Sequence, residues 1–306
     1  MRPPHRLAAL GCAALVVSAL LLSEATAQRF SMSYLYFGTP AAYVERVERT
    51  RGSLDEISPN YFNLNTDGTL NFTGGSSAKS FVAEMHQQGV RVVPFLSNHW
   101  DRALGQRALE NREKLAEQIA QAIQEYNLDG INVDIENVTH QERNAYSAFV
   151  ELLRKKLPSD KVIGVAVAAN PYGYTQGWQG SYDYSRLSKA ADYLMLMTYD
   201  EHYQGGPPGP VASRDFQEKS IQYALRHVPA EQIVLGLPFF GRIWSDSGTV
   251  MNGHGVSESQ IHELLALYRG TVTQDAASGS TRAKITVTES DQKPVINGVT
   301  LTPGTY

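Results

Sequence analysis

From about residue 30, segments with two different spacings of hydrophobic residues alternate along the chain. Short runs rich in Val, Ile, Leu, Tyr and Phe, typical of buried strands, alternate with segments whose apolar residues recur every three or four positions, typical of amphipathic helices. We predict strands at residues 30–37, 55–64, 90–96, 128–136, 162–168, 192–199 and 232–237, and helices at residues 41–51, 77–88, 108–126, 139–156, 184–190 and 214–227. This alternation predicts right-handed βα units and a parallel α/β barrel.

The alternation stops after the seventh predicted strand. Residues 257–268 form one predicted helix, and the rest of residues 246–306 contains two or three short strands and turns, which indicates a small α+β insertion. A barrel of seven strands leaves an unpaired edge. We therefore expect residues 28–306 to form a (β/α)8 TIM barrel with this insertion after strand 7. The eighth βα unit is missing from the pattern, as in a truncated form of a longer reading frame.

Residues 128–136 combine apolar and polar positions in an uncommon way. The segment is rich in Ile and Val directly after a predicted helix, so we predict a strand. Successive strand side chains point to opposite faces, which places Asn132, Asp134 and Glu136 on one face. Burying unpaired carboxylates is costly, so this polar face indicates a chemical role. The alternative is an edge strand with one solvated face, but Gly130 and the outward Ile and Val residues favour a central strand.

The first 27 residues differ from the rest of the chain. A basic start is followed by a mostly apolar run at residues 7–22 and by Ala25-Thr26-Ala27, which is typical of a cleaved secretory signal peptide. A transmembrane anchor is the alternative, but the apolar run is short for one. The single cysteine, Cys12, lies inside this segment, so the mature chain has no disulfide. We expect a secreted protein, extracellular or in the cell wall or periplasm, with no membrane partner after cleavage.

Three segments resemble one enzyme family. Residues 129–136 resemble the fourth-strand signature of family-18 glycoside hydrolases, Asp-x-x-Asp-x-Asp-x-Glu, although Asn132 stands where many members carry Asp. Residues 197–200 resemble the family's Met-x-Tyr-Asp, and residues 236–242 its Gly-x-Pro-Phe-Tyr-Gly-Arg, with Phe240 in place of the commoner Tyr. The resemblance covers roughly residues 30–244. Residues 200–210 are similar to the branch that acts on bacterial spore and cell-wall peptidoglycan.

The resemblance implies substrate-assisted hydrolysis, in which the 2-acetamido oxygen of the sugar attacks its own anomeric carbon. Glu136 is then the acid and later the base. Asp134 orients the acetamide N–H and raises the pKa of Glu136, and Tyr199 and Asp200 hold the acetamide oxygen and neighbouring hydroxyls. Tyr199 has an alternative role as a core aromatic residue.

Further substrate-binding candidates are Asn132, Met197, Asn98, Trp100 and Arg242. Asn98 and Trp100 belong to a polar and aromatic loop after the third strand, where a sugar groove is expected. Met197 can equally be a packing residue, Arg242 a structural ion-pair partner, and Trp100 an ordinary loop residue.

The expected function is a secreted glycosidase that cleaves β-1,4 bonds of N-acetylglucosamine-containing glycans, with peptidoglycan favoured. The alternatives are a chitinase, or a catalytically silent chitin- or peptidoglycan-binding protein of lectin type. We expect a polysaccharide partner, a monomer, and no cofactor. The net charge of −4 does not suggest nucleic acid, and the eight histidines form no pattern that predicts a metal site.

Overall fold

A computed structural model describes residues 29–246 and 251–306. Residues Ser31–Tyr306 form one compact unit. The predicted signal peptide at residues 1–27, with Cys12, lies outside the described residues.

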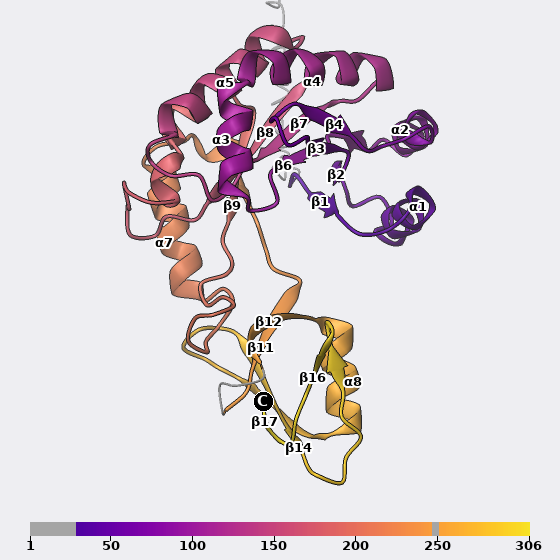
Figure 1. Cartoon of the computed structure of the whole chain (residues 1–306), viewed down its shortest axis with the longest axis vertical. Helices are drawn as coiled ribbons and strands as arrows, with labels where there is room; N and C mark the ends of the chain where they lie inside the picture. The colour runs from indigo at the N-terminus through magenta and orange to yellow at the C-terminus, as the bar shows by residue number, and fades with distance from the viewer. Residues whose placement is uncertain (1–28, 247–250) are drawn as a thin grey trace, which may run out of the picture. The chain divides into compact units, whose positions relative to one another are not determined.

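Parallel strands covered by helices make up the larger part of this unit (Figure 1). These strands are β1 (Met32–Leu35), β2 (Glu56–Pro59), β3 (Phe62–Leu64), β5 (Arg91–Val92), β6 (Phe95–Ser97), β7 (Gly130–Asp134), β8 (Val162–Ala168), β9 (Tyr193–Met197) and β10 (Ile233–Leu235). β1 pairs with β2, and β2 with β5; β3 pairs with β6, and the order then runs β6, β7, β8, β9, β10. Among the described residues, no parallel strand pairs with the outer edge of β1 or of β10.

Two predicted strands are each divided into two. Residues 55–64 form β2 and β3, and residues 90–96 form β5 and β6 around Pro94. Proline has no N–H to donate, and here its carbonyl accepts from Asn132 N at 2.9 Å while Val93 N donates to Ile57 O at 2.9 Å. The ladder therefore passes from one neighbouring strand to the other at this point.

A hairpin that the pattern did not predict follows β3. β4 (Leu70–Phe72) pairs antiparallel with β3. A turn at residues 65–68 joins the two strands, and Gly68 N donates to Asn65 O at 2.8 Å. Gly68 has φ +80, a conformation that glycine adopts without strain.

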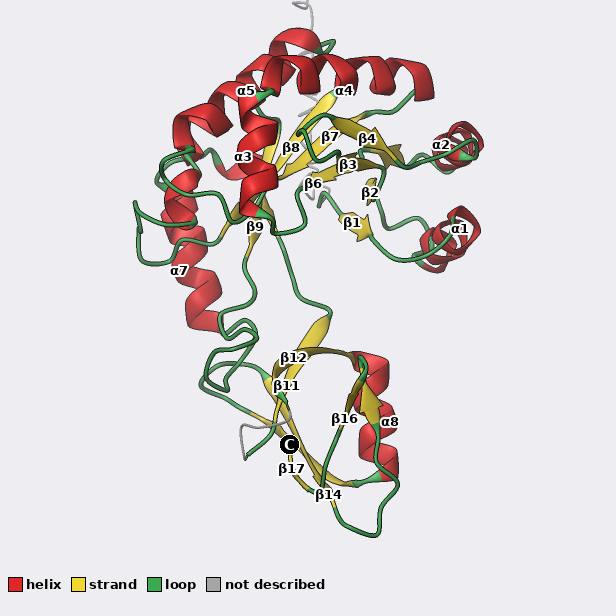
Figure 2. Ribbon diagram, viewed as in Figure 1, coloured by secondary structure: helices red, strands yellow, loops and turns green. Residues whose placement is uncertain are grey.

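The helices lie outside the parallel strands (Figure 2). They are α1 (Pro40–Arg49), α2 (Ala78–Gln87), α3 (Arg102–Glu110), α4 (Arg112–Tyr126), α5 (Arg143–Lys156), α6 (Tyr184–Leu187) and α7 (Arg214–Leu225), with short 3-10 turns at η1 (Gln179–Ser181) and η2 (Ala230–Gln232). The single predicted helix at 108–126 is two helices. They meet at Asn111, whose φ of −89 and ψ of 18 are not helical and whose side chain donates to Asp67 O at 2.5 Å.

Two apolar clusters line the two faces of the strands. The larger lies between strands and helices and includes Ile131, Val133 and Ile135 of the β7 segment. The smaller occupies the barrel interior and includes Tyr193 and Met195. Gly164 of β8 leaves room there for the Tyr193 ring, since a Cβ at Gly164 would lie 2.4 Å from that ring.

The chain continues after β10 into antiparallel strands with their own apolar cluster, which includes Ile243, Val256, Leu264 and Ile285. The elements are β11 (Phe240–Trp244), β12 (Asn252–Ser257), α8 (Glu258–Leu267), β13 (Arg269–Gln274), β14 (Thr281–Val287), β15 (Val295–Ile296), β16 (Val299–Thr300) and β17 (Gly304–Thr305). α8 matches the predicted helix, and a capping box of Ser257 and Gln260 starts it. Because β11 begins at Phe240, this α+β part starts a few residues before the predicted boundary at 246.

Candidate active site

The carboxyl ends of β6, β7 and β9 carry most of the candidate residues. β7 ends at Asp134, which lies opposite Ser97 at the end of β6, and β9 ends at Met197. Because the strands are parallel, the segments that follow them emerge at the same end of the barrel. Glu136, the loop at residues 98–100, and Tyr199 and Asp200 therefore belong to one end of the sheet.

Asp134 and Glu136 are two neighbouring carboxyl groups on the same side of the β7 segment. Burial raises the pKa of Asp134 above its ordinary value. Burial, and after it the charges of Asp134 and Asp200, raise the pKa of Glu136 well above its ordinary value. Among the described residues, no side chain donates a hydrogen bond to either carboxyl group. The pair is therefore arranged to hold a proton near neutral pH.

Asn98 holds the backbone of Glu136. Its Nδ2 donates to Glu136 O at 2.9 Å and to Asp101 O at 2.8 Å, and its Oδ1 accepts from Glu136 N at 2.8 Å. The residue is fully buried. The predicted substrate contact at Asn98 is therefore corrected: this side chain positions Glu136 and is closed to a sugar.

Asn132 requires the same correction. It is fully buried, Nδ2 donates to the Tyr193 hydroxyl at 3.1 Å, and Oδ1 accepts from the Tyr34 hydroxyl at 3.2 Å. Both polar atoms of the Asn132 amide are therefore bound inside the barrel. Asn132 shares the inner face of β7 with Asp134, as predicted, but it lies deeper in the barrel and serves the interior instead of the substrate.

Tyr199 lies among three carboxyl groups. Burial, and then the charges of Asp134, Glu136 and Asp200, raise the pKa of its hydroxyl far above the ordinary value. Its ring meets Phe240 edge to face at 5.9 Å between centroids. A neutral phenol among carboxyl groups can donate one hydrogen bond to an acceptor oxygen of a bound sugar.

Asp200 and Arg242 form an ion pair. Arg242 Nε donates to Asp200 Oδ1 at 2.9 Å, and Arg242 Nη1 donates to Gly253 O at 2.8 Å. Arg242 therefore has the structural role that was the alternative to substrate contact. Met197 is buried in the interior apolar cluster, where it packs. Substrate contact by Asp200, Met197 and Arg242 stays a prediction.

Trp100 lies in a strained and well-braced loop. His99 and Trp100 have φ of +49 and +65, which non-glycine residues rarely adopt. Asn137 Nδ2 donates to Trp100 O at 2.8 Å, and the Trp100 ring meets Trp178 edge to face at 4.9 Å. With 51% of its surface exposed, Trp100 offers an apolar face to solvent, as a sugar platform requires.

Several residues that the sequence pattern did not assign to the site come from segments distant in the chain. Tyr34 and Tyr193 bind Asn132, and Tyr182 accepts from Trp178 Nε1 at 2.9 Å and donates to Ile135 O at 3.1 Å. Glu56, fully buried in β2, accepts from the Tyr193 hydroxyl. Only Glu56 had a usable signal, an acidic residue at the start of an apolar run.

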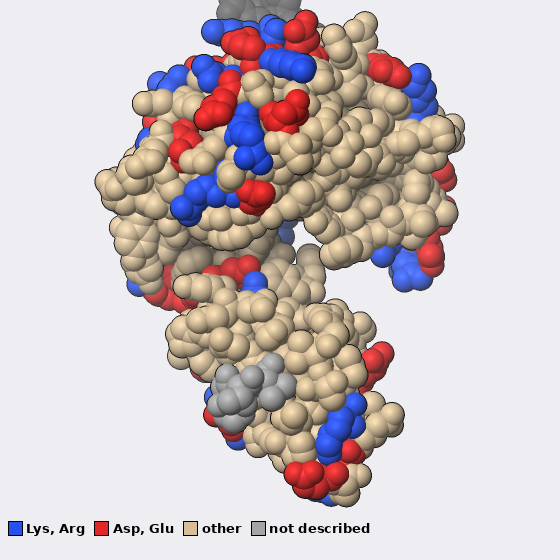
Figure 3. All heavy atoms as spheres, viewed as in Figure 1, with Lys and Arg blue, Asp and Glu red and all other residues tan. Residues whose placement is uncertain are grey.

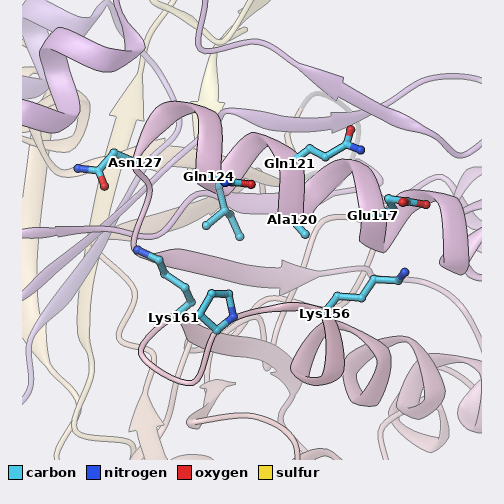
Figure 4. A pocket seen from close by; sticks show the side chains of 9 residues that line it. Glu117, Ala120, Gln121, Gln124, Asn127, Lys156 and Lys161 are labelled. Carbon is cyan, nitrogen blue, oxygen red and sulfur yellow. The ribbon is translucent and has the colours of Figure 1, made fainter.

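A hollow of about 560 Å³ lies at the opposite end of the strands. Asn127 and Lys161, which directly precede the segments of β7 and β8, line it together with polar side chains of α4 and α5 (Figure 4). It contains none of the candidate residues. We therefore assign it no part in the chemistry.

The described residues contain no group of three or more His, Cys, Asp or Glu arranged to hold a metal ion. No helix in the described part of the chain is long and apolar enough to cross a membrane. Basic and acidic side chains are intermixed on the face that Figure 3 shows.

Comparison with known proteins identifies the family of the chain. Residues 35–293 match the family model described as glycosyl hydrolases family 18. The chain belongs to glycoside hydrolase family 18. Within this family 18 chain, the matched range includes β7, the loop after β6, and the ends of β9 and β10.

Among curated relatives, the chain is 29% identical over 175 residues to the uncharacterized glycosylase YvbX of Bacillus subtilis, covering 56% of this chain and 50% of that protein. It is 27% identical over 190 residues to the cortical fragment-lytic enzyme of B. subtilis, covering 60% of this chain and 44% of that enzyme. The chain thus spans half or less of the length of these two relatives.

Solved structures share the fold. The Bacillus cereus spore cortex-lytic enzyme SleL has a TM-score of 0.74 at 21% identity, covering 89% of this chain and 63% of that chain. A chitinase from Chromobacterium violaceum has a TM-score of 0.74 at 24% identity, covering 85% of this chain and 84% of that chain. The α/β architecture therefore matches the barrels of family 18.

Proposed function

We propose that the chain is a secreted glycosidase that cleaves β-1,4 bonds of N-acetylglucosamine-containing glycans by substrate-assisted, retaining hydrolysis. The single observation that carries the proposal is the pair Asp134 and Glu136 at the carboxyl end of β7. Burial raises the pKa of both carboxyl groups, and the charges of Asp134 and Asp200 raise that of Glu136 further. A carboxylate nucleophile has to face the sugar from the side opposite the acid. Asp134 and Glu136 come from the same side of one strand, so the pair fits an acid with a partner better than an acid with an opposed nucleophile.

In the first step, protonated Glu136 donates its proton to the glycosidic oxygen as the bond to the anomeric carbon breaks. The acetamido oxygen of the same sugar forms the new bond to that carbon and gives an oxazolinium ion. The Asp134 carboxylate accepts the acetamide N–H and balances the positive charge. Tyr199 donates its O–H to the acetamide oxygen and orients it.

In the second step, the Glu136 carboxylate takes a proton from water as the water oxygen attacks the anomeric carbon. The oxazolinium ring opens, the acetamido group is restored, and Glu136 is protonated for the next cycle. Two displacements at one carbon return the starting configuration. The protein therefore needs no nucleophile of its own.

Peptidoglycan is the proposed substrate. The similarity of residues 200–210 to the peptidoglycan-active branch supports it, as do relatives whose names include cortical fragment-lytic and spore cortex-lytic enzymes. Secretion, with cleavage after residue 27, is part of the proposal. The structural match to a chitinase supports chitin as the second candidate.

The test offers purified peptidoglycan and N-acetylglucosamine oligomers to the folded chain and measures new reducing ends. We expect release from both, with faster release from peptidoglycan. Release from chitin oligomers alone would reverse the substrate assignment. No release from either by a well-folded protein would favour the silent binding protein.

A further inference from the structure

We propose that Glu56 is a positioning residue for the Asp134 and Glu136 pair, acting through Tyr193 and Asn132. The inference rests on the proposed hydrolysis and concerns a carboxyl group that no step of that hydrolysis uses. Glu56 is fully buried in β2, and Asn132, Tyr193 and Tyr34 connect it to the inner face of β7.

The hydrogen bonds that connect Glu56, Tyr193, Asn132 and Tyr34 all run in one direction. The Tyr193 hydroxyl donates its only proton to Glu56 Oε1 at 2.5 Å, so its oxygen is left to accept from Asn132 Nδ2 at 3.1 Å. The amide of Asn132 is thereby oriented with Oδ1 toward Tyr34, whose hydroxyl donates to it at 3.2 Å. The ionised carboxylate of Glu56 thus determines which way the Asn132 amide points.

Strand register places Asn132 and Tyr193 on either side of Gly164. Asn132 of β7 lies opposite Gly164 of β8, and Gly164 lies opposite Tyr193 of β9. Because Gly164 has no side chain, the Tyr193 ring fills its place and reaches across β8 to Asn132. A Cβ at Gly164 would lie 2.5 Å from the Tyr193 hydroxyl oxygen, so the contact depends on glycine here.

Tyr34 carries the effect to the carboxyl pair. The Tyr34 hydroxyl is bound to Asn132, and Asp134 follows Asn132 by two residues on the same face of β7, so the hydroxyl and the Asp134 carboxyl share this face. In keeping with this placement, burial and after it the charge of Asp134 raise the pKa of the Tyr34 hydroxyl well above its ordinary value. With its proton committed to Asn132, the Tyr34 hydroxyl presents only its oxygen to other neighbours. Asp134 is thereby denied a hydrogen bond that would stabilise its charged form, and this maintains the raised pKa of the pair.

Charged groups surround Glu56 from three neighbouring segments. Arg91 of β5 lies 3.3 Å from Glu56 Oε2, and the charges of Asp129 and Asp192 act from the segments before β7 and β9. Burial raises the pKa of Glu56 to about 7, against the lowering effect of Tyr193 and Arg91. Once protonated, Glu56 can donate to the Tyr193 oxygen, the Asn132 amide can turn over, and the Tyr34 proton becomes free to serve Asp134.

The test compares Glu56→Gln and Tyr193→Phe with wild type in pH profiles of kcat and kcat/KM on a soluble N-acetylglucosamine oligomer. Each variant nearly keeps the volume of the side chain. Glu56→Gln removes the carboxylate that accepts from Tyr193, and Tyr193→Phe removes the hydroxyl that joins Glu56 to Asn132. We expect kcat to fall by about 10-fold or more, with KM little changed, as for other residues that orient a site from behind. The acidic limb of both profiles should shift by about half a pH unit or more.

Matched controls lie close by. Ser58→Ala removes a buried hydrogen bond of the same strand, from Ser58 Oγ to Val93 O, and Tyr184→Phe removes a buried tyrosine hydroxyl bond to Ala168 O. Both should lose stability and keep the wild-type profile. Profiles of Glu56→Gln and Tyr193→Phe that overlay wild type, or controls that shift equally, would overturn the proposal.

A readout without turnover separates this inference from the proposed function. In protein labelled with 13C at Asp carboxyl groups, NMR titration follows Asp134, identified by its loss in Asp134→Asn. We expect its titration to move in Tyr193→Phe and to stay unchanged in Tyr184→Phe. An unmoved titration would contradict the inference even if the chain hydrolyses glycans; inactive wild type with a moved titration would contradict only the proposed function.

Discussion

The two faces of the β7 segment are built on opposite principles. Ile131, Val133 and Ile135 on the outer face are fully buried against the helices and have only apolar neighbours to satisfy. Asn132, Asp134 and Glu136 on the inner face lie among tyrosines, an asparagine and other carboxyl groups. The same short segment thus contributes stability through one face and chemistry through the other.

The inner face carries a cost that the outer face offsets. Buried carboxyl groups with raised pKa values disfavour the folded state at neutral pH, because the unfolded chain would ionise them freely. Burying the outer aliphatic side chains stabilises the fold by about 1.5–3 kcal/mol each. Burial of the outer face therefore offsets the cost of holding the carboxyl pair on the inner face of the same segment.

The largest expected effect comes from the inner face. Glu136→Gln keeps the size of the side chain and removes the proton, so kcat should fall on the order of 10²–10⁴-fold while oligosaccharide binding persists. Steady-state kinetics and calorimetric titration measure the two. The matched control is Glu142→Gln, which alters a carboxylate that caps the turn at Thr139. Retained turnover in Glu136→Gln would remove Glu136 from the role of acid.

The outer face should show the converse. Ile131→Ala leaves a cavity in the larger apolar cluster and should lower the free energy of unfolding by about 2–5 kcal/mol. Below the melting temperature, kcat should stay within a few-fold of wild type, because Ile131 points away from the site. Urea unfolding with activity measured on the folded fraction tests this. A loss of kcat comparable to that of Glu136→Gln would show that the two faces are not separable.

The smallest effect is on the pH dependence of stability. Burial raises the pKa of Asp134 to about 7, and burial with the charges of Asp134 and Asp200 raises the pKa of Glu136 to about 9. The native state therefore binds more protons than the unfolded state between about pH 4 and pH 9. Stability from these groups is present at low pH and is lost as pH rises through that window. Urea unfolding from pH 5 to pH 9 should show a shallower decline in Glu136→Gln. Parallel curves would contradict the raised pKa of Glu136.

The sequence predicted most of the barrel because most strands and helices follow one hydrophobic period each. β8 has the predicted bounds, α2 is one residue shorter at each end, and α7 begins at the predicted residue and ends two residues early. The failures are local. Pro94 divides one strand and Asn111 one helix, and both depend on bonds to Asn132 and Asp67 that lie far away in the chain.

Site prediction was limited by depth and register. Alternation along β7 shows which face a side chain occupies but not how far down the barrel it lies, so Asn132 was assigned to the substrate. Tyr34 and Tyr193 contact Asn132, and Glu56 contacts Tyr193, across strands that are far apart in the chain. No periodicity within one strand reveals such contacts. The position of Asn98 after β6 made it a candidate for substrate binding. Its actual partner, the backbone of Glu136, is a tertiary contact that the sequence pattern does not reveal.

The most direct test of the central claim is whether cleavage requires the acetamido group of the reacting sugar. Wild-type protein is incubated with fully acetylated and fully deacetylated β-1,4 oligomers of equal length, and the products are followed by mass spectrometry, with early NMR spectra for the anomer. Substrate-assisted hydrolysis predicts cleavage of the acetylated oligomer alone, with the β configuration retained. Cleavage of the deacetylated oligomer at a comparable rate, or inversion at the anomeric carbon, would contradict it.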